Sequence, residues 1–311
     1  MPFVEKKFII DKEIQIFLFL MRTLKLSHGD AQKLVHKGRV KQHDIVVTSP
    51  STMMSGEINV ILFEALEFDI EPIFSTKDFM IFDKPSGVLV HPTNRWTPLS
   101  MLDAMRRYGG SAANPVHRID KETSGLLVSS IHKDAEVILK GAFENRGVKK
   151  SYLAWVDGKI DNDFEVDKPI LKRDNYDFIK HKVEINDTGK ISLTRFYPLE
   201  YDEKLDATLL RCEPHSGRMH QIRIHLFHVK HPILGDPLYG TAFDISNSYL
   251  NMELDDEVRA IETGATRLML HAQTLAFEYG ARFSIESRFD FSGVIRDITP
   301  KDKRRFNGRN N

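Results

Sequence analysis

The sequence contains little that would support a disulfide-bonded, membrane-spanning or metal-binding protein. Cys212 is the only cysteine in 311 residues, which excludes an intrachain disulfide and a cysteine-based metal cluster. The apolar run at residues 14–21 is too short to cross a membrane, and no small-residue cleavage site follows an apolar segment near the N-terminus. None of the 13 histidines stands in a His-Glu-x-x-His spacing, and no glycine-rich phosphate loop or dinucleotide fingerprint occurs. We therefore expect a cytoplasmic protein that does not associate with a membrane.

Net charge is also absent, because 44 Lys and Arg balance 44 Asp and Glu. Nucleic-acid-binding proteins usually carry a basic excess. The excess here is local: residues 22–41 contain six Lys or Arg against Asp30, and residues 301–309 contain five against Asp302. Since a local basic patch is sufficient to attract phosphate groups, the balanced total does not exclude a nucleic-acid partner.

The first 68 residues have the pattern of a small separate module. Ser27 is a candidate N-cap for a short helix, and Gly38 is placed to end the turn that follows it. Strands are predicted at residues 40–47 and 58–63, around a turn at residues 54–56. This alternation of one helix and short strands predicts a small α/β module.

Three cations of this module, Lys33, Lys37 and Arg39, would project from the helix and the turn after it. That arrangement suits RNA phosphates, and a basic face that meets only solvent is the alternative. Residues 67–73 are the expected linker to the rest of the chain. After it, residues 79–92 have the strand, Pro-Ser-Gly turn, strand pattern of a hairpin.

A polar turn at residues 117–125, His-Arg-Ile-Asp-Lys-Glu-Thr-Ser-Gly, precedes an apolar run typical of a strand. Asp120 lies between Arg118 and Lys121, and nearby positive charge favours the ionised form of a carboxyl group. The small residues at positions 123–125 would leave room for a ligand. An ionised carboxylate can attack a sugar carbon or stabilise a developing cation. A surface turn with a salt bridge is the alternative.

A second polar stretch, residues 213–226, contains Arg218, Arg223 and three histidines within eleven positions. Because these side chains would be costly to bury unpaired, we expect them to face solvent, an anion or each other. Helices are predicted at residues 97–108 and 133–145. The polar, acidic block at residues 243–264 is expected to be an insertion or a mobile helix.

Several of these stretches resemble the motifs of one enzyme family. Residues 117–125 are similar to the His-Arg-Leu-Asp-x-x-Thr-Ser-Gly motif of the RluA-type RNA pseudouridine synthases, with Ile119 in place of leucine. Residues 216–225 resemble the family's Thr-Gly-Arg-x-His-Gln-Ile-Arg-x-His motif, with serine in place of threonine. Residues 150–156 resemble its Lys-x-Tyr-x-Ala-x-Val motif, and residues 84–92 resemble its Lys-Pro-x-Gly-x-x-Val-His-Pro element.

The resemblance implies roles for particular side chains. Asp120 takes the place of the catalytic aspartate, and Tyr152 that of the active-site tyrosine, which would stack on uracil and could help to remove the proton from its carbon 5. Arg223 takes the place of the arginine that pairs with the aspartate, with Arg218 as the alternative. Arg118 is expected to fill the gap that the target base leaves in its stack. The reaction that the resemblance implies needs no cofactor and no metal.

The resemblance also implies an α+β fold and three segments. Residues 72–300 would form the catalytic domain, with a curved, mostly antiparallel mixed sheet and flanking helices. Residues 26–40 are similar to the RNA-binding domain of the ribosomal protein S-four type, so residues 1–68 would form an RNA-binding module, although its usual Arg-x-Asp-x-x-Leu opening is absent. Residues 301–311 would be a basic C-terminal tail.

The implied activity is the conversion of specific uridines to pseudouridine in structured RNA, and we expect 23S large-subunit rRNA as the substrate and a monomeric enzyme. Asp120 would either attack the sugar or remove its 2′ proton. A tRNA-modifying enzyme of the same family and a non-catalytic RNA-binding or ribosome-assembly protein are the alternatives. A hydrolase that uses Asp120 together with Glu122 is a further alternative, which would release free uracil from RNA.

Overall fold

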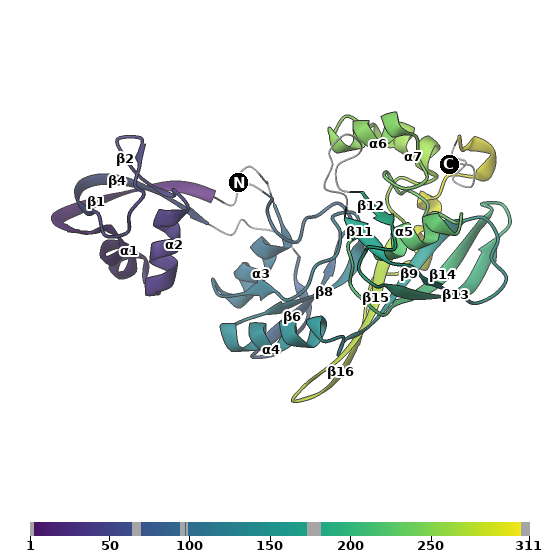
Figure 1. Ribbon diagram of the computed structural model, residues 1–311, viewed down its shortest axis with the longest axis horizontal. Helices are drawn as coiled ribbons and strands as arrows, with labels where there is room; N and C mark the ends of the chain where they lie inside the picture. The colour runs from purple at the N-terminus through teal and green to yellow at the C-terminus, as the bar shows by residue number, and fades with distance from the viewer. Residues whose placement is uncertain (1–2, 64–69, 94–96, 98, 173–181, 306–311) are drawn as a thin grey trace. The chain divides into compact units, whose positions relative to one another are not determined.

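The computed structural model describes residues 3–63, 70–93, 97, 99–172 and 182–305 (Figure 1). Backbone contacts divide the chain into two units: Met1–Phe68 with Pro92–Asp103, and Asp69–His91 with Ala104–Asn311. A four-stranded sheet belongs to the smaller unit, and a ten-stranded sheet belongs to the larger one. Among the described residues, no helix is long and apolar enough to cross a membrane.

The smaller unit pairs two helices with its sheet. In chain order its elements are β1 (Phe3–Gln15), α1 (Ile16–Leu24), α2 (His28–His36), β2 (Val40–Gln42), β3 (Ile45–Val46) and β4 (Met53–Phe63), and the strand order is β1-β4-β2-β3. As predicted, the Ser27 hydroxyl caps α2 by accepting a hydrogen bond from the Asp30 N–H group, and Gly38 follows the helix with a φ of 64°. Leu20 of α1 and Val35 of α2 are fully buried in one apolar cluster with residues of the sheet.

The prediction of a turn at residues 54–56 is wrong, because β4 runs through this segment. Gly56 pairs with Ile10 beside an irregularity in β1, and its φ of 84° shows why glycine occurs within the strand. The chain reverses instead at His43 and Asp44, between β2 and β3. Sequence patterns did not reveal β1 or α1.

The sheet of the larger unit has the order β10-β13-β14-β9-β15-β8-β6-β5, with β16 beside β15 and β7 beside β8. The strands are β5 (Pro72–Ser75), β6 (Phe79–Lys84), β7 (Asn114–Pro115), β8 (Ser124–Ser130), β9 (Lys149–Asp157), β10 (Phe164–Asp167), β13 (Leu193–Asp202), β14 (Ala207–Pro214), β15 (Leu270–Tyr279) and β16 (Ala281–Glu286). Strands β8 and β15 are parallel, and the other described pairs are antiparallel. The predicted α+β class with a mostly antiparallel mixed sheet is confirmed.

Short helices and one small ribbon accompany this sheet (Figure 1). They are α3 (Met101–Gly109), α4 (Lys133–Glu144), α5 (Gln221–His228), α6 (Phe243–Leu250), α7 (Asp256–Thr263), the 3-10 turns η1 (Ser292–Asp297) and η2 (Lys301–Lys303), and the ribbon of β11 (Ile170–Lys172) with β12 (Val183–Ile185). The helix predicted at 133–145 is present as α4. The one predicted at 97–108 begins only at Met101, where the Asp103 carboxylate accepts hydrogen bonds from the Ser100 N–H and hydroxyl groups.

Two apolar clusters fix the helices that lie close to the ends of β8 and β9. Leu139 of α4 packs with Leu126 of β8 in one cluster, and Leu226 of α5 packs with Trp155 of β9 in the other. Burial of each such side chain contributes about 1.5–3 kcal/mol relative to exposure. These contacts fix the orientation of α5, and with it the stretch that follows residue 216, against the central strands.

The hairpin predicted at residues 79–92 does not form, because β6 pairs with β5 and β8 instead. After β6 the chain wraps around the buried Lys84 ammonium, which donates hydrogen bonds of 2.8 Å to the carbonyl groups of Pro85, Val88 and Lys121. Burial lowers the pKa of Lys84 to about 7, while the nearby acids Glu122 and Asp120 oppose this shift. Lys84 therefore ties the turn after β6 to the polar turn before β8.

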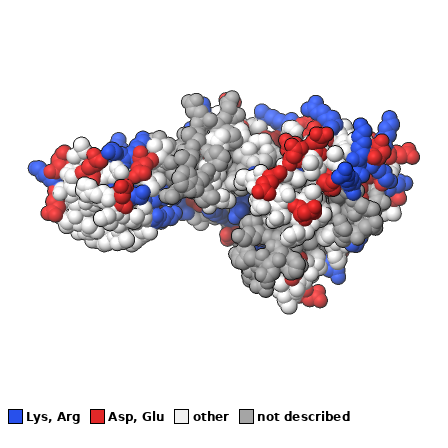
Figure 2. All heavy atoms as spheres, turned by 90° about the horizontal axis from the view of Figure 1, so that it is seen from above, with Lys and Arg blue, Asp and Glu red and all other residues white. Residues whose placement is uncertain are grey.

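The expected linker is partly a strand, and the basic tail is paired with acidic side chains. Residues 67–69 of the expected linker lie outside the described residues, and its last residues begin strand β5. In the tail, Lys301 pairs with Asp206 at 2.6 Å, and Arg304 pairs with Asp157 at 3.4 Å. Figure 2 shows basic and acidic side chains interspersed on the face that it displays. Cations of the tail thus neutralise acids of the larger unit.

The block at residues 243–264 forms α6 and α7, which are anchored to the polar turn before β8. The buried Glu122 carboxylate accepts a hydrogen bond of 3.0 Å from the Tyr249 hydroxyl of α6 and one of 2.8 Å from the Arg259 guanidinium of α7. Arg259 also donates to the Gly235 carbonyl group at 3.1 Å. These contacts connect the two helices with a position only two residues from Asp120.

Substitution of Gly125 by alanine should destabilise the larger unit strongly. Gly125 has a φ of 106°, and an added Cβ would overlap the backbone of Ala272 in the neighbouring strand β15. We expect a loss of at least about 3 kcal/mol in the free energy of unfolding, measured by chemical denaturation. Gly280→Ala is the matched control, because φ is 66° there but no atom lies within 4 Å of the added Cβ. An equal effect of the two substitutions would contradict the steric explanation.

Arg259→Met should lower stability by about 3–5 kcal/mol near neutral pH, because it leaves the buried Glu122 carboxylate without its cation. Burial alone would raise the pKa of Glu122, but Arg259 and Tyr249 hold it below its usual value of 4.5. The stabilisation is therefore complete above that value and is lost as the pH falls toward the lowered pKa.

Denaturation curves of wild type and Arg259→Met should accordingly converge on acidification below about pH 4.5. Arg195→Met is the control, since its ion pair with Glu165 is exposed and should contribute less than about 1 kcal/mol. A difference between wild type and Arg259→Met that does not depend on pH would contradict the assigned ion pair.

Candidate active site

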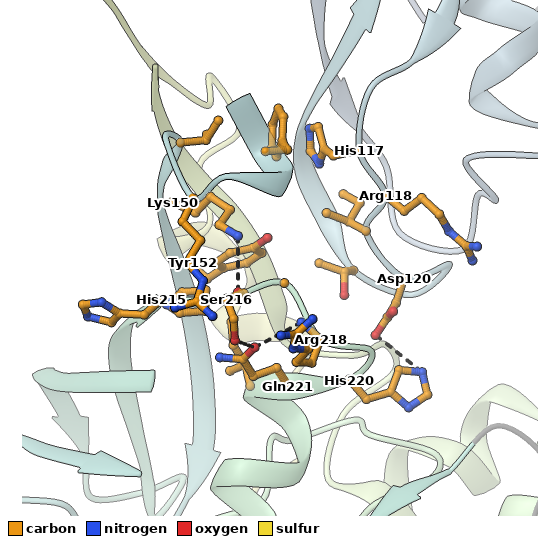
Figure 3. A pocket seen from close by; sticks show the side chains of 18 of the residues that line it. His117, Arg118, Asp120, Lys150, Tyr152, His215, Ser216, Arg218, His220 and Gln221 are labelled. Atoms are coloured by element: carbon orange, nitrogen blue, oxygen red, sulfur yellow. Dashed lines mark hydrogen bonds and ion pairs between the residues drawn. The ribbon is translucent and has the colours of Figure 1, made fainter. Parts of the chain in front are cut away.

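A cavity of about 540 Å³ in the larger unit brings together the three side chains that were predicted to form a catalytic site, and Figure 3 shows two of them, Asp120 and Tyr152. Asp120 comes from the turn before β8, Tyr152 from β9, and Arg223 from the first turn of α5. Arg118 and Arg218 line the same cavity. The fold thus joins motifs that are about one hundred residues apart in the sequence.

Arg223 connects the cavity with a buried acid behind it. Its Nη1 donates to Asp120 Oδ2 at 3.1 Å, while its Nε and Nη2 donate to the two oxygens of Asp236 at 2.7 and 2.8 Å. The side chains of Arg223 and Asp236 are 3% and 1% exposed, whereas that of Asp120 is 28% exposed. A bidentate pair of this kind fixes the plane of the guanidinium, so its remaining donor has a defined direction toward Asp120.

The surroundings of Asp120 favour its ionised form. Burial would raise the pKa of the Asp120 carboxyl, but His220, Arg223 and Lys84 outweigh this effect and hold the pKa below its usual value. Arg223 donates its hydrogen bond to Asp120 Oδ2. No hydrogen bond from another described residue reaches the second oxygen, Oδ1. At neutral pH the cavity therefore contains a carboxylate with Oδ2 bound by Arg223 and with Oδ1 free of hydrogen bonds from the described residues.

His220 is the second neighbour of Asp120. Its Nε2 lies 3.7 Å from Asp120 Oδ2, and Figure 3 shows the two side chains pointing toward each other. On the other side of the ring, His220 Nδ1 lies 3.0 Å from the Tyr239 hydroxyl group. Tyr239 is buried, and its ring also lies against the Arg223 guanidinium, with 5.1 Å between the guanidinium carbon and the ring centroid.

Tyr152 provides an aromatic surface in the cavity. It lies in the middle of the sheet, where β9 pairs with β14 at Cys212 and with β15 at Ala272. Burial, and then the nearby Asp120 carboxylate, raise the pKa of the Tyr152 hydroxyl above its usual value. The side chain is therefore a neutral phenol at physiological pH, which suits stacking and hydrogen bonding better than abstraction of a proton.

The cavity wall carries more cations than the sequence analysis singled out. Besides Arg118 and Arg218, it includes Lys140, Arg146 and Lys150. The Lys150 ammonium donates to the Ser216 carbonyl group at 3.3 Å, and burial lowers the pKa of Lys150. Cations on several sides of one cavity are typical of a site that binds phosphate groups.

The remaining predicted RNA-binding residues belong to the smaller unit. Lys33 and Lys37 are exposed, with the Lys33 ammonium 3.2 Å from the Asp30 carboxylate. Arg39 is half-buried, and burial lowers its pKa. Because the exposed pair of Lys33 and Asp30 is screened by water, it contributes little to stability and leaves Lys33 accessible.

Two histidines, one in the stretch at residues 117–125 and one in the stretch at residues 216–225, make contacts within the fold. His117 stacks on Phe143 and accepts a hydrogen bond from the Val128 N–H group, and burial lowers its pKa to about 3. His225 faces neither solvent nor an anion, contrary to expectation, because it is buried against Thr194 and the Lys168 carbonyl group.

The expectation that positions 123–125 all leave room for a ligand is correct only for the first of them. Thr123 lines the cavity. The buried Ser124 hydroxyl lies 2.8 Å from His271 Nδ1, and Gly125 is required by the close approach of β15. Glu122 is likewise engaged with Arg259, outside the cavity, and is therefore not placed to act as a second carboxylate beside Asp120 in a hydrolase mechanism. No group of three or more His, Cys, Asp or Glu in the described part of the chain could bind a metal ion.

Sequence patterns missed Asp236, Tyr239 and His220 as partners of the predicted residues. Asp236 and Tyr239 occur in the turn-rich stretch at residues 231–240, which the sequence analysis did not include in the site. One signal was available: an acid in an otherwise apolar stretch is a candidate partner for a buried arginine. Neither the hydrophobic periodicity nor the spacing of the motifs could show which arginine pairs with Asp236.

Known proteins share both the sequence and the fold of this chain. The family model for RNA pseudouridylate synthase matches residues 78–228. An uncharacterized RNA pseudouridine synthase of Helicobacter pylori strain ATCC 700392 / 26695 is 39% identical over 303 residues, which cover 96% of this chain and 99% of that protein. The ribosomal large subunit pseudouridine synthase D of Nitrosomonas europaea is 35% identical over 182 residues, which cover 57% of this chain and 52% of that protein.

Among solved structures, human RNA Pseudouridylate Synthase Domain Containing 1 is similar in fold, with a TM-score of 0.58 and 23% identity over 75% of this chain and 89% of that one. The extended similarity to the Helicobacter pylori protein covers both units, and the family model covers the strands and motifs that form the cavity. The chain belongs to the RluA-type family of RNA pseudouridine synthases.

Proposed function

We propose that this RNA pseudouridine synthase modifies uridines of large-subunit rRNA and that Asp120 is its catalytic carboxylate. The observation that carries the proposal is the pairing of Asp120 with the buried Arg223 guanidinium, inside a cavity that Tyr152 and several cations also line. An ionised carboxylate with one accessible oxygen is the group that a reaction at the ribose requires.

The reaction rearranges bonds without consuming water. The bond between ribose carbon 1′ and uracil nitrogen 1 breaks, the base turns, and carbon 1′ forms a new bond to uracil carbon 5. The proton on carbon 5 is lost, and nitrogen 1 gains one. Asp120 starts this sequence either by attack on carbon 1′ or by removal of the 2′ proton, and both routes need the carboxylate in its ionised form.

Tyr152 and Arg223 support this step in different ways. The Tyr152 ring would stack on the uracil while it is detached, because an aromatic face binds a base without regard to its orientation. As its raised pKa keeps the hydroxyl protonated, Tyr152 would assist loss of the carbon 5 proton only by passing it on, not as a phenolate base. Arg223 would orient Asp120 and keep it ionised.

RNA would reach the cavity with the target uridine turned out of its stack. Arg118 is exposed at the edge of the cavity and would fill the gap in the stack, while Arg218 and Lys150 would contact phosphate groups. The smaller unit would act as an RNA-binding module of the ribosomal protein S-four type, in which Lys33, Lys37 and Arg39 contact the backbone of structured RNA.

Large-subunit rRNA is favoured over tRNA by the relatives of the chain. Proteins of Nitrosomonas europaea and Vibrio parahaemolyticus that resemble it are ribosomal large subunit pseudouridine synthases D. A non-catalytic RNA-binding protein would not need an aspartate with a depressed pKa in a cavity with an aromatic side chain. We further expect the enzyme to act as a monomer in the cytoplasm, where rRNA and tRNA are modified.

Asp120→Asn should abolish pseudouridine formation while RNA binding persists, because the amide can neither attack carbon 1′ nor accept a proton from carbon 2′. Pseudouridine maps of rRNA and tRNA from cells that lack the gene, with wild type or variant restored, measure this directly. We expect a large-subunit rRNA site that wild type restores and Asp120→Asn does not. Asp161→Asn is the control, because Asp161 is an exposed acid that lies far from Asp120 in the sequence. Restoration of the site by Asp120→Asn would contradict the proposal, and loss of a tRNA site alone would assign the substrate to tRNA.

The acid limb of the pH–rate profile should move to higher pH when Arg223 no longer supports Asp120. Since Arg223 lowers the pKa of Asp120, its removal should raise the pH below which the carboxyl becomes protonated and inactive. The double variant Arg223→Gln with Asp236→Asn avoids a buried unpaired carboxylate. Initial rates between pH 4 and pH 8 test the shift, and an unchanged acid limb at a reduced rate would exclude this electrostatic role.

A further inference from the structure

His220 stands between Asp120 and Tyr239, with Nε2 facing the carboxylate and Nδ1 in hydrogen-bond contact with the Tyr239 hydroxyl. The Val183 N–H group donates to the Tyr239 oxygen at 3.0 Å, so the hydroxyl hydrogen is available for His220 Nδ1, also at 3.0 Å. Nε2 carries a hydrogen both in the neutral imidazole that accepts at Nδ1 and in the imidazolium. That nitrogen is the one that faces Asp120 Oδ2, at 3.7 Å.

Tyr239 is itself held in place by the acid that positions Arg223. Asp236 Oδ1 accepts hydrogen bonds from the N–H groups of Leu238 and Tyr239, at 2.9 and 3.1 Å, in addition to its contacts with the guanidinium. The turn at residues 236–239 therefore fixes two donors at once. One is the Arg223 guanidinium, and the other is His220, through the Tyr239 hydroxyl.

Both donors meet the same oxygen of Asp120. Arg223 Nη1 donates to Oδ2, and His220 Nε2 faces Oδ2 from a different element, the residue before α5. Two fixed directions at one oxygen define the plane of the carboxylate, which a single donor does not. Hydrogen bonds in a catalytic site are often long without substrate and shorten when it binds, so a separation of 3.7 Å is compatible with a donor that engages during the reaction.

We propose that His220 is a positioning residue, held by Tyr239 with its Nε2–H group toward Asp120, and that it directs Asp120 Oδ1 toward the ribose of the target uridine. This inference rests on the proposed role of Asp120. Displacement of a reacting group by about 1 Å can reduce a rate by about 100-fold, so the orientation of the carboxylate is a direct determinant of turnover.

Two substitutions at His220 separate positioning from a merely structural role. Glutamine places an N–H donor about where Nε2 lies, and so retains the contact with Asp120. Asparagine places its oxygen about where Nδ1 lies, and so retains only the contact with Tyr239. His220 has a φ of 52°, a backbone conformation that asparagine tolerates better than glutamine does. A structural role therefore predicts that asparagine is the milder change, and a positioning role predicts the opposite.

The experiment uses the full chain and large-subunit rRNA from cells that lack the gene. Single-turnover rates of pseudouridine formation and the Kd for the same RNA are measured for wild type, His220→Gln, His220→Asn and the control His228→Gln, an exposed position at the end of α5. We expect His220→Asn to be slower by about 10- to 100-fold and His220→Gln by less than about threefold. The Kd should change by less than about twofold in every case.

Several results would overturn the inference. They are a His220→Asn rate equal to that of wild type, a His220→Asn rate equal to or above that of His220→Gln, and a defect confined to Kd. If thermal unfolding shows that neither variant folds, Tyr239→Phe decides. It should be slower by about 10-fold, because His220 then loses the hydrogen bond that fixes the orientation of its ring, and a wild-type rate would reject the inference. Absence of pseudouridine formation by wild type itself would contradict the proposed rRNA substrate instead.

Discussion

Arg223 carries its charge where almost no solvent reaches it, so its position is set by carboxylates and not by water. Asp236 takes two of its donors and Asp120 takes a third. A buried guanidinium without Asp236 would be strongly destabilising, and so would the buried Asp236 carboxylate without the cation. The cavity consequently depends on the buried pair of Arg223 and Asp236. The same pair that stabilises the fold also keeps Asp120 ionised and oriented.

The turn that contains Asp120 is fixed from several sides. The Lys84 ammonium binds a carbonyl group at one end of it, and Glu122 connects it with α6 and α7 through Tyr249 and Arg259. None of these groups needs to touch RNA to affect the reaction. They reduce the freedom of the carboxylate that we propose acts on the ribose, which is the usual requirement for a preorganised catalytic group.

Much of this candidate site could be predicted from the sequence, because its candidate catalytic residues lie in local motifs. Strands β6 and β8, the helix α4 and the meeting of Asp120, Tyr152 and Arg223 in one site could be predicted from motif resemblance and hydrophobic pattern, whereas β1 and α1 could not. The connection of the strands did not follow. The turn after β6 looks like a hairpin by its Pro-Ser-Gly sequence, yet Lys84 redirects it by long-range hydrogen bonds. Long-range hydrogen bonds of this kind cannot be recognised from a local sequence pattern.

The partners of the predicted residues were hidden for a related reason. Asp236 and Tyr239 occur in a stretch with ordinary turn composition, and only the packing of α5 against the sheet shows that Arg223 and His220 meet them. Gly125 is a similar case, since its small size seemed suited to a ligand and is explained by the backbone of β15. Residues that act through others thus became visible only in three dimensions.

The most direct test of this account is a structure of the Asp120→Asn protein bound to a fragment of large-subunit rRNA that contains its target uridine. The account predicts a uridine turned out into the cavity, with its base against Tyr152 and its ribose beside the side chain at position 120. A target nucleotide bound outside the cavity, or a ribose that faces Glu144 and lies out of reach of position 120, would contradict the assignment of Asp120 as the catalytic group.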